Sequence, residues 1–193
     1  MTRATPTAAS PLSPDHLLEL EAARARAKKV RRAAGVAALS GWTLAIFAGV
    51  TLIGGVLGDG IALVLGAALG AMAFVELRGA RALKAFDPRG ARHLGFNQIA
   101  LGTLIVAYSA WSLYQATRTS PLASMGSTGD PNLDATVEQL SKSLAYGLYA
   151  LLGATGVIVP GLTAWYYFSR ERLVRAFVAG TPTWVVDTLR AAG

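Results

Sequence analysis

Residues 86–98, FDPRGARHLGFNQ, form a short polar stretch between two long apolar runs. Residues 87–90, DPRG, have the order typical of a type I turn, with Asp first, Pro second and Gly fourth. Pro88 also disfavours the helical conformation at Asp87, so a helix arriving from the N-terminal side is expected to end near Phe86. The stretch therefore predicts a tight connector between two helices.

The apolar residues on both sides of this connector gather in long blocks. The chain of 193 residues is 53% hydrophobic and only 15% charged, and this composition in blocks excludes an ordinary soluble domain. A helix needs about 20 apolar residues to cross a bilayer core of about 30 Å. The sequence thus predicts an all-α fold, an integral membrane four-helix bundle with spans at about 33–57, 60–78, 94–117 and 143–169.

The segments outside the spans differ from them in composition. Residues 1–14 are rich in Thr, Ala, Pro and Ser and predict a disordered tail, whereas residues 15–32 predict a basic cytoplasmic helix. Residues 170–193 predict a cytoplasmic tail with a short interfacial helix, which leaves residues 33–169 as the transmembrane domain. No signal peptide is expected, because the first apolar block is longer than the core of one and lacks a convincing cleavage site.

The distribution of basic residues predicts the orientation. Of the 18 Lys and Arg residues, all but Arg118 and Lys142 lie before the first span, between the second and third spans, or after the fourth. Because cytoplasmic loops carry an excess of Lys and Arg, both termini are expected in the cytoplasm, with the protein in the cytoplasmic (inner) membrane. Trp165, Tyr166 and Tyr167 are expected at the inner headgroup level, where such rings are enriched. The net charge of +7 then indicates contact with anionic lipid rather than with nucleic acid.

Five basic side chains surround the connector between the second and third spans: Arg78, Arg81, Lys84, Arg89 and Arg92. One interpretation is that they only set the topology. The other is that they bind a lipid headgroup or phosphate, with the backbone N–H of Gly90 close to the anion.

Glu76 is the single acidic residue within the nominal second span. Acidic residues inside a membrane are costly and are candidates for function. Asn97 and Gln98 lie at a matching depth on the third span, so a structural contact with them is one interpretation. A proton or cation relay through Glu76 is the other.

Small residues predict where helices pack closely. Gly66 and Gly70 form a GxxxG motif in the second span, and the first span has a similar row, Gly41, Ala45 and Gly49. Such rows can pack within one bundle or between molecules. In the fourth span, the ring of Pro160 would clash with the carbonyl of Gly156, which predicts a kink there.

The sequence lacks the common catalytic motifs. It has no Walker A loop, no GxSxG elbow, no HExxH motif and no cysteine, so we expect no catalytic residue, metal or cofactor. The leading hypothesis is a non-enzymatic membrane protein that acts through self-assembly or a membrane partner protein, with its basic cytoplasmic face on anionic lipid. The alternative is a small oligomeric channel or transporter that uses Glu76, Asn97, Gln98 and the kinked span. An enzyme acting on lipid headgroups is a third, weaker hypothesis.

Overall fold

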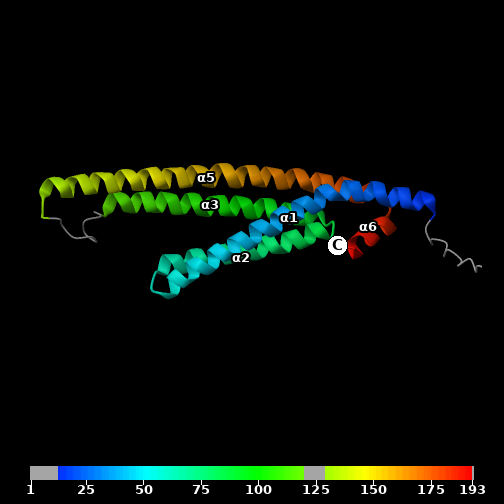
Figure 1. Ribbon diagram of the computed structural model, residues 1–193, viewed down its shortest axis with the longest axis horizontal. Helices are drawn as coiled ribbons and strands as arrows, with labels where there is room; N and C mark the ends of the chain where they lie inside the picture. Colours follow the sequence, from blue (N-terminus) through cyan, green and yellow to red (C-terminus); the bar gives the residue numbers. More distant parts are fainter. Residues whose placement is uncertain (1–12, 120–128, 193) are drawn as a thin grey trace, which may run out of the picture.

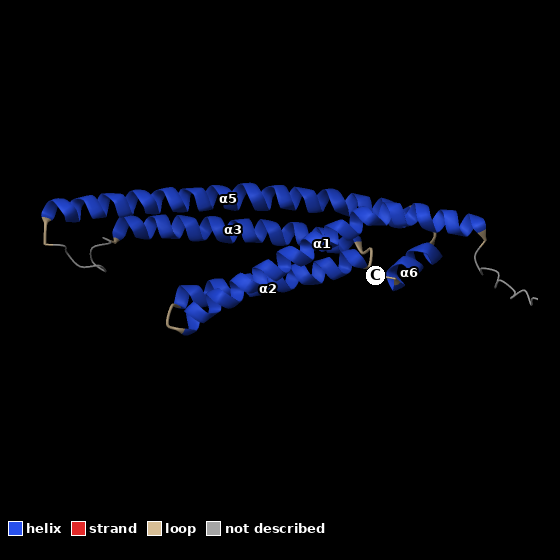
Figure 2. Ribbon diagram, viewed as in Figure 1, coloured by secondary structure: helices blue, strands red, loops and turns tan. Residues whose placement is uncertain are grey.

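The computed structural model describes residues 13–119 and 129–192, which form helices joined by short turns and contain no strand (Figure 2). The helices are α1 (Pro14–Val56), α2 (Gly60–Lys84), α3 (Pro88–Arg118), α5 (Pro131–Ala179) and α6 (Thr183–Ala191). Helices α1, α2, α3 and α5 are each long and apolar enough to cross a membrane. The prediction of an all-α fold with four membrane-spanning helices is confirmed. Most of the predicted N-terminal tail, residues 1–12, lies outside the described residues.

The four long helices begin at side-chain caps. Ser13, Asp59, Asp87 and Asp130 each accept a hydrogen bond from a backbone N–H of the first turn that follows. In α1, α3 and α5 a proline comes directly after the cap, where its missing N–H costs nothing and its fixed φ suits a helix. Local sequence therefore sets where each long helix starts.

Helices α1 and α5 extend well beyond their predicted spans. Helix α1 has 43 residues and joins the predicted basic helix to the first span without a break. Helix α5 has 49 residues and continues past residue 169 to Ala179. At 1.5 Å per residue these helices are about 64 and 73 Å long, against a hydrocarbon core of about 30 Å. Each must therefore project out of the membrane.

The long helices pair as two antiparallel hairpins, α1 with α2 and α3 with α5 (Figure 1). The hairpins meet near the corner between α2 and α3 and diverge toward their other ends (Figure 1). Residues 14–32, 78–92 and 170–192 lie at the end where they meet, which we call the basic end. The opposite end, where α1 turns into α2 and α3 ends, we call the open end.

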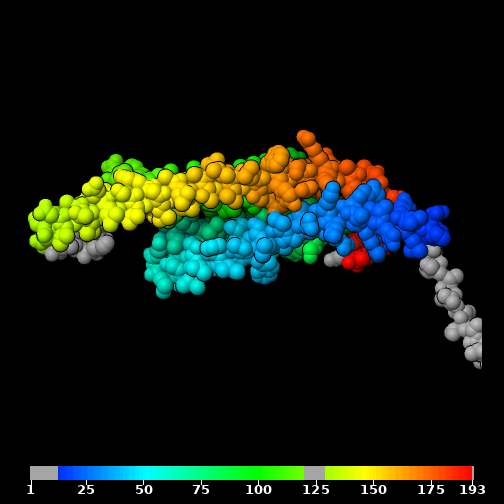
Figure 3. All heavy atoms as spheres, turned by 45° about the horizontal axis from the view of Figure 1, so that its top comes forward, coloured from blue at the N-terminus to red at the C-terminus, as the bar shows by residue number. Residues whose placement is uncertain are grey.

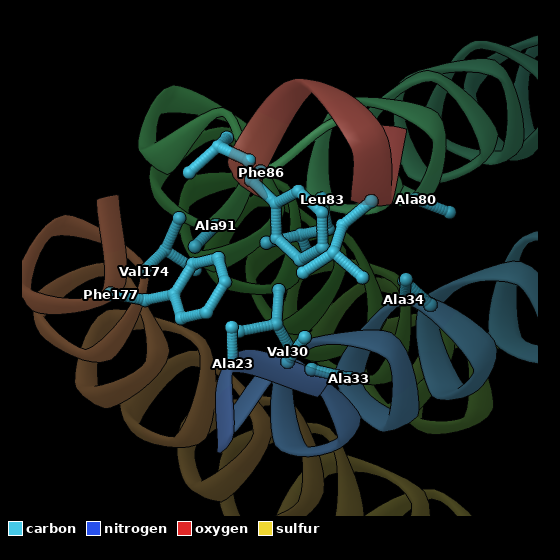
Figure 4. Packing of buried hydrophobic residues seen from close by; sticks show 14 of the residues in the cluster. Ala23, Val30, Ala33, Ala34, Ala80, Leu83, Phe86, Ala91, Val174 and Phe177 are labelled. Atoms are coloured by element: carbon cyan, nitrogen blue, oxygen red, sulfur yellow. The ribbon is translucent and has the colours of Figure 1, made fainter. Parts of the chain in front are cut away.

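A hydrophobic core closes the basic end. Its buried members come from all five helices and from the corner: Leu20, Ala23, Ala27, Val30, Ala33, Ala34, Ala37, Ala80, Leu83, Phe86, Ala91, Leu94, Tyr167, Val174, Phe177, Val185, Val186 and Leu189. Phe86 from the corner and Phe177 from α5 lie with ring centroids 5.0 Å apart, near Leu83 (Figure 4). The three members from α6 turn the apolar face of that helix toward the protein.

Both ends of the described chain lie at the basic end. The red α6 lies beside the blue N-terminal part of α1 (Figure 3). The rings of His16 and Trp184 are 5.2 Å apart, and Arg31 Nη2 donates a 2.8 Å hydrogen bond to the carbonyl of Leu189. Both ends of the described chain therefore lie on the same side of the four helices, and the cytoplasmic location of that side stays a prediction.

The corner between α2 and α3 is shorter than the sequence predicts. Helix α2 ends at Lys84, and a Schellman motif closes it: Phe86 N donates to Leu83 O at 3.0 Å and Asp87 N to Ala82 O at 3.0 Å. Asp87 then caps α3. Residues 88–90, which were predicted to lie in a turn, form the first turn of α3, because Asp-Pro is also the start signal of a helix.

Candidate functional site

A buried polar cluster holds the two hairpins together. Asn97 Nδ2 donates a 2.7 Å hydrogen bond to Glu76 Oε2, and Gln98 Nε2 donates a 2.9 Å hydrogen bond to Glu76 Oε1. Asn97 Nδ2 also donates to the carbonyl of Met72 at 3.1 Å. Glu76 is fully buried, and both amides are nearly so. The structure thus brings together the three polar residues that the sequence singled out.

Two further hydroxyl groups lie beside this carboxylate. They belong to Ser40 of α1 and Tyr167 of α5, so all four spanning helices contribute to the surroundings of Glu76. The Tyr167 hydroxyl is buried and makes no hydrogen bond with good geometry to the described residues. We call Ser40, Glu76, Asn97, Gln98 and Tyr167 the Glu76 cluster.

The burial of Tyr167 is a feature that sequence reasoning missed. Its neighbour Trp165 is 73% exposed, as a residue at the headgroup level should be, but Tyr167 is fully buried against the core. Sequence reasoning treated Trp165, Tyr166 and Tyr167 as one aromatic belt. A helix turns by about 100° per residue, so three consecutive side chains point in different directions and need not all face the lipid. This periodicity was the available signal, although it does not say which ring turns inward.

Predicted small residues pack inside the α1–α2 hairpin. A Cβ atom added at Gly41 would lie 2.9 Å from the Leu77 side chain, and one at Gly66 would lie 2.7 Å from Leu52 Cγ. Gly70 faces Ala48 at an ordinary 3.9 Å.

The rest of the predicted row on α1 is less tightly packed. Ala45 is half-buried, and a Cβ atom at Gly49 would meet no described atom within 4 Å. The buried small residue in this part of α1 is Ala48 and not Gly49. Packing by Gly49 against another molecule stays a prediction.

A close approach between α3 and α5 was not predicted. A Cβ atom at Gly102 would lie 2.7 Å from the carbonyl oxygen of Gly156 and 3.2 Å from Pro160 Cβ. A Cβ atom at Gly156 would in turn lie 2.6 Å from Ile105 Cγ2. Helix α5 stays helical through Pro160, and the kink stays a prediction. The Gly156 carbonyl, which the ring of Pro160 should exclude from helical hydrogen bonding, is the one that faces Gly102.

This approach makes Gly102 sensitive to a single methyl group. We expect Gly102→Ala to destabilise the folded protein by about 1–3 kcal/mol, because its obstacle is backbone on α5 and the helices must move apart. The matched control is Gly161→Ala, whose added Cβ would meet nothing within 4 Å, and which should be neutral or slightly stabilising. Unfolding of both variants in mixed micelles, followed by tryptophan fluorescence, measures the difference. Equal stabilities would contradict the tight contact.

The five basic residues around the corner do not form one site. The ring of Phe96 lies 5.7 Å from the guanidinium carbon of Arg92, and Arg81 Nε donates to the carbonyl of Leu77 at 3.4 Å. Lys84 is exposed. Arg78 and Arg89 line a groove of ≈ 500 Å³ together with Phe74, Val75, Gly79, Ala82, Asp87, Gly90 and His93. We call it the α2–α3 groove.

These features define the class of the protein: a multi-pass, all-helical membrane protein whose two hairpins are joined by a core and a buried polar cluster. Comparison with protein-family models, curated proteins and solved structures finds no match to the chain. Among residues 13–119 and 129–192, no group of three or more His, Asp or Glu residues is placed to hold a metal ion.

Proposed function

We propose that the protein is a non-enzymatic protein of the cytoplasmic membrane that works by assembly. Membrane-spanning helices of a second copy, or of a partner protein, pack along the diverging hairpins, while the basic end lies at the anionic lipid headgroups of the cytoplasmic face. The divergence of the hairpins from a closed basic end carries this proposal (Figure 1).

The contrast between the two ends supports it. At the basic end each helix buries apolar side chains in a common core. Between the hairpins, the Met72 carbonyl and the Glu76 carboxylate accept hydrogen bonds from Asn97, and Gly79 packs on Leu94. Beyond them, toward the open end, Val50 and Val64 of the α1–α2 hairpin are 65% and 69% exposed. Apolar helix faces of this kind suit lipid or another helix, and Gly49 would let a neighbour approach closely.

The orientation in this proposal follows from charge. Arg and Lys residues of three separate segments lie at the basic end, and each can gain about 1 kcal/mol near an anionic surface. The aromatic side chain of Trp165, exposed close to that end, suits the headgroup level.

The alternative of a channel or transporter has weaker support. Glu76 is its natural relay, but both carboxylate oxygens accept hydrogen bonds from buried amides, and the residue is fully buried. This arrangement favours a structural role, in which Glu76 fixes one hairpin against the other.

Crosslinking of single-cysteine variants tests assembly directly, because the chain has no cysteine of its own. We expect Val50→Cys, on the exposed side of the open end, to form a disulfide-linked dimer or a defined partner adduct in native membranes. Lys29→Cys, exposed at the basic end, is the control and should crosslink much less. A protein that stays monomeric in lipid nanodiscs, with no adduct from either variant, would overturn the proposal.

A further inference from the structure

We propose that the α2–α3 groove binds one anionic phospholipid, with the lipid phosphate on Arg78, Arg89 and His93 and the start of an acyl chain against Phe74 and Val75. The inference rests on the proposed function insofar as the basic end must lie at the headgroups. It goes further by assigning one site, one ligand class and a residue, His93, outside the predicted basic set.

The groove combines two kinds of wall. Arg78 and Phe74 lie one helical turn apart on α2, which separates their levels by about 6 Å along the helix. Phe74 is 58% exposed and Val75 is 37% exposed. The charged side chains of the groove thus lie closer to the basic end, and the exposed apolar side chains lie next to them on the membrane side. A phospholipid has this order of groups, with the phosphate above the ester-linked chains, whereas free phosphate would use only the upper wall.

The basic side chains of the groove are available for a ligand. The side chains of Arg78, Arg89 and His93 make no hydrogen bond or ion pair within the part of the chain that the structure describes. Three arginines elsewhere at the basic end are engaged: Arg31 and Arg190 donate to backbone carbonyls, and Arg175 pairs with Glu171. Arginine suits phosphate because its planar N–H groups can bind two oxygens at once.

Asp87 also lines the groove, but its carboxylate is already engaged. Its Oδ1 atom accepts a 2.9 Å hydrogen bond from the backbone N–H of Arg89, as the cap of α3. Two arginines against one aspartate leave the groove with net positive charge. Gly90 lets α3 lie close against α2 beside the groove, because a Cβ atom there would lie 2.7 Å from Ala82 Cβ.

Native mass spectrometry with phosphatidylglycerol as the probe tests the site. The full chain is released from nanodiscs of phosphatidylglycerol and phosphatidylcholine, and bound lipid is counted. Arg78→Gln/Arg89→Gln changes the groove, and Arg81→Gln/Arg92→Gln removes the same charge outside it. We expect wild type and the second variant to retain one phosphatidylglycerol, and the groove variant to retain roughly tenfold less.

Other outcomes decide against the site. Equal retention by the two double variants, whether high or low, would show that the groove arginines are not a specific lipid site. Displacement of the lipid by millimolar inorganic phosphate that itself stays bound would assign the groove to a free anion. His93→Gln, a milder change, should lower retention about threefold and guards against misfolding of the double variant. The same spectra report oligomeric state, so loss of the lipid site with a preserved oligomer leaves the assembly proposal standing.

Discussion

Phe86→Ala should lower the free energy of unfolding by about 3–5 kcal/mol, the largest loss that we expect from a single substitution in this protein. Phe86 is fully buried at the corner between the hairpins and packs on Phe177. Its ring contributes to the core that joins α2, α3 and α5, so the cavity left behind would weaken the junction itself. Unfolding in mixed micelles, followed by fluorescence of the four tryptophans, measures the loss.

A second substitution at the same position isolates the effect of the backbone conformation on stability. Phe86 has a φ of 56°, in the left-handed region that residues other than glycine rarely adopt. In a helix interior glycine is worse than alanine by about 0.5–1 kcal/mol. Here the order should reverse, with Phe86→Gly more stable than Phe86→Ala by about 1 kcal/mol.

The control for both variants is Phe47→Ala, which removes the same ring from a side chain that is 61% exposed. It should cost far less, because the ring contacts lipid or detergent and not the core. An alanine variant at least as stable as the glycine variant, or a Phe47→Ala loss of similar size, would contradict the role assigned to the corner.

Features that depend on neighbouring residues could be predicted from the sequence. The length of each apolar block gave the four spans, because crossing a bilayer requires a minimum helix length. Asp130 followed by Pro131 has the pattern of a helix start, and α5 begins there, since capping is a local interaction. Asn97 and Gln98 could be matched to Glu76 because a short corner joins two antiparallel helices. Residues at similar distances from that corner along each helix lie at similar depths in the membrane.

Features that depend on which helix faces meet could not be predicted. Gly102 and Gly156 lie far apart in the sequence, on the two arms of one hairpin, and nothing near either residue in the sequence indicates that one lies against the other. The proximity of Ser40 and Tyr167 to Glu76 could not be predicted for the same reason. The divergence of the hairpins is likewise a property of long-range packing. In a membrane a lipid tail and a leucine are similarly apolar, so hydrophobicity alone does not select the partner of a helix face.

Glu76→Leu should destabilise the protein by about 2–5 kcal/mol although it keeps the side-chain volume nearly constant. The substitution removes the acceptor of both amide hydrogen bonds, and each buried donor left unpaired costs roughly 1–3 kcal/mol. Glu138→Leu is the matched control, since Glu138 forms a partly exposed ion pair with Lys142 on the surface of α5, and loss of such a pair costs about 0–1 kcal/mol.

The triple variant Glu76→Leu/Asn97→Leu/Gln98→Leu separates the hydrogen bonds from the packing around them. Removing both donors together with the acceptor leaves none of these amide groups unpaired, so the triple variant should regain much of the stability that Glu76→Leu loses. Recovery would mean that the cluster serves to fix the register of the two hairpins, because an apolar junction could replace it. A triple variant no more stable than Glu76→Leu would contradict this structural role, since the loss would then arise from something other than unpaired amides at the junction.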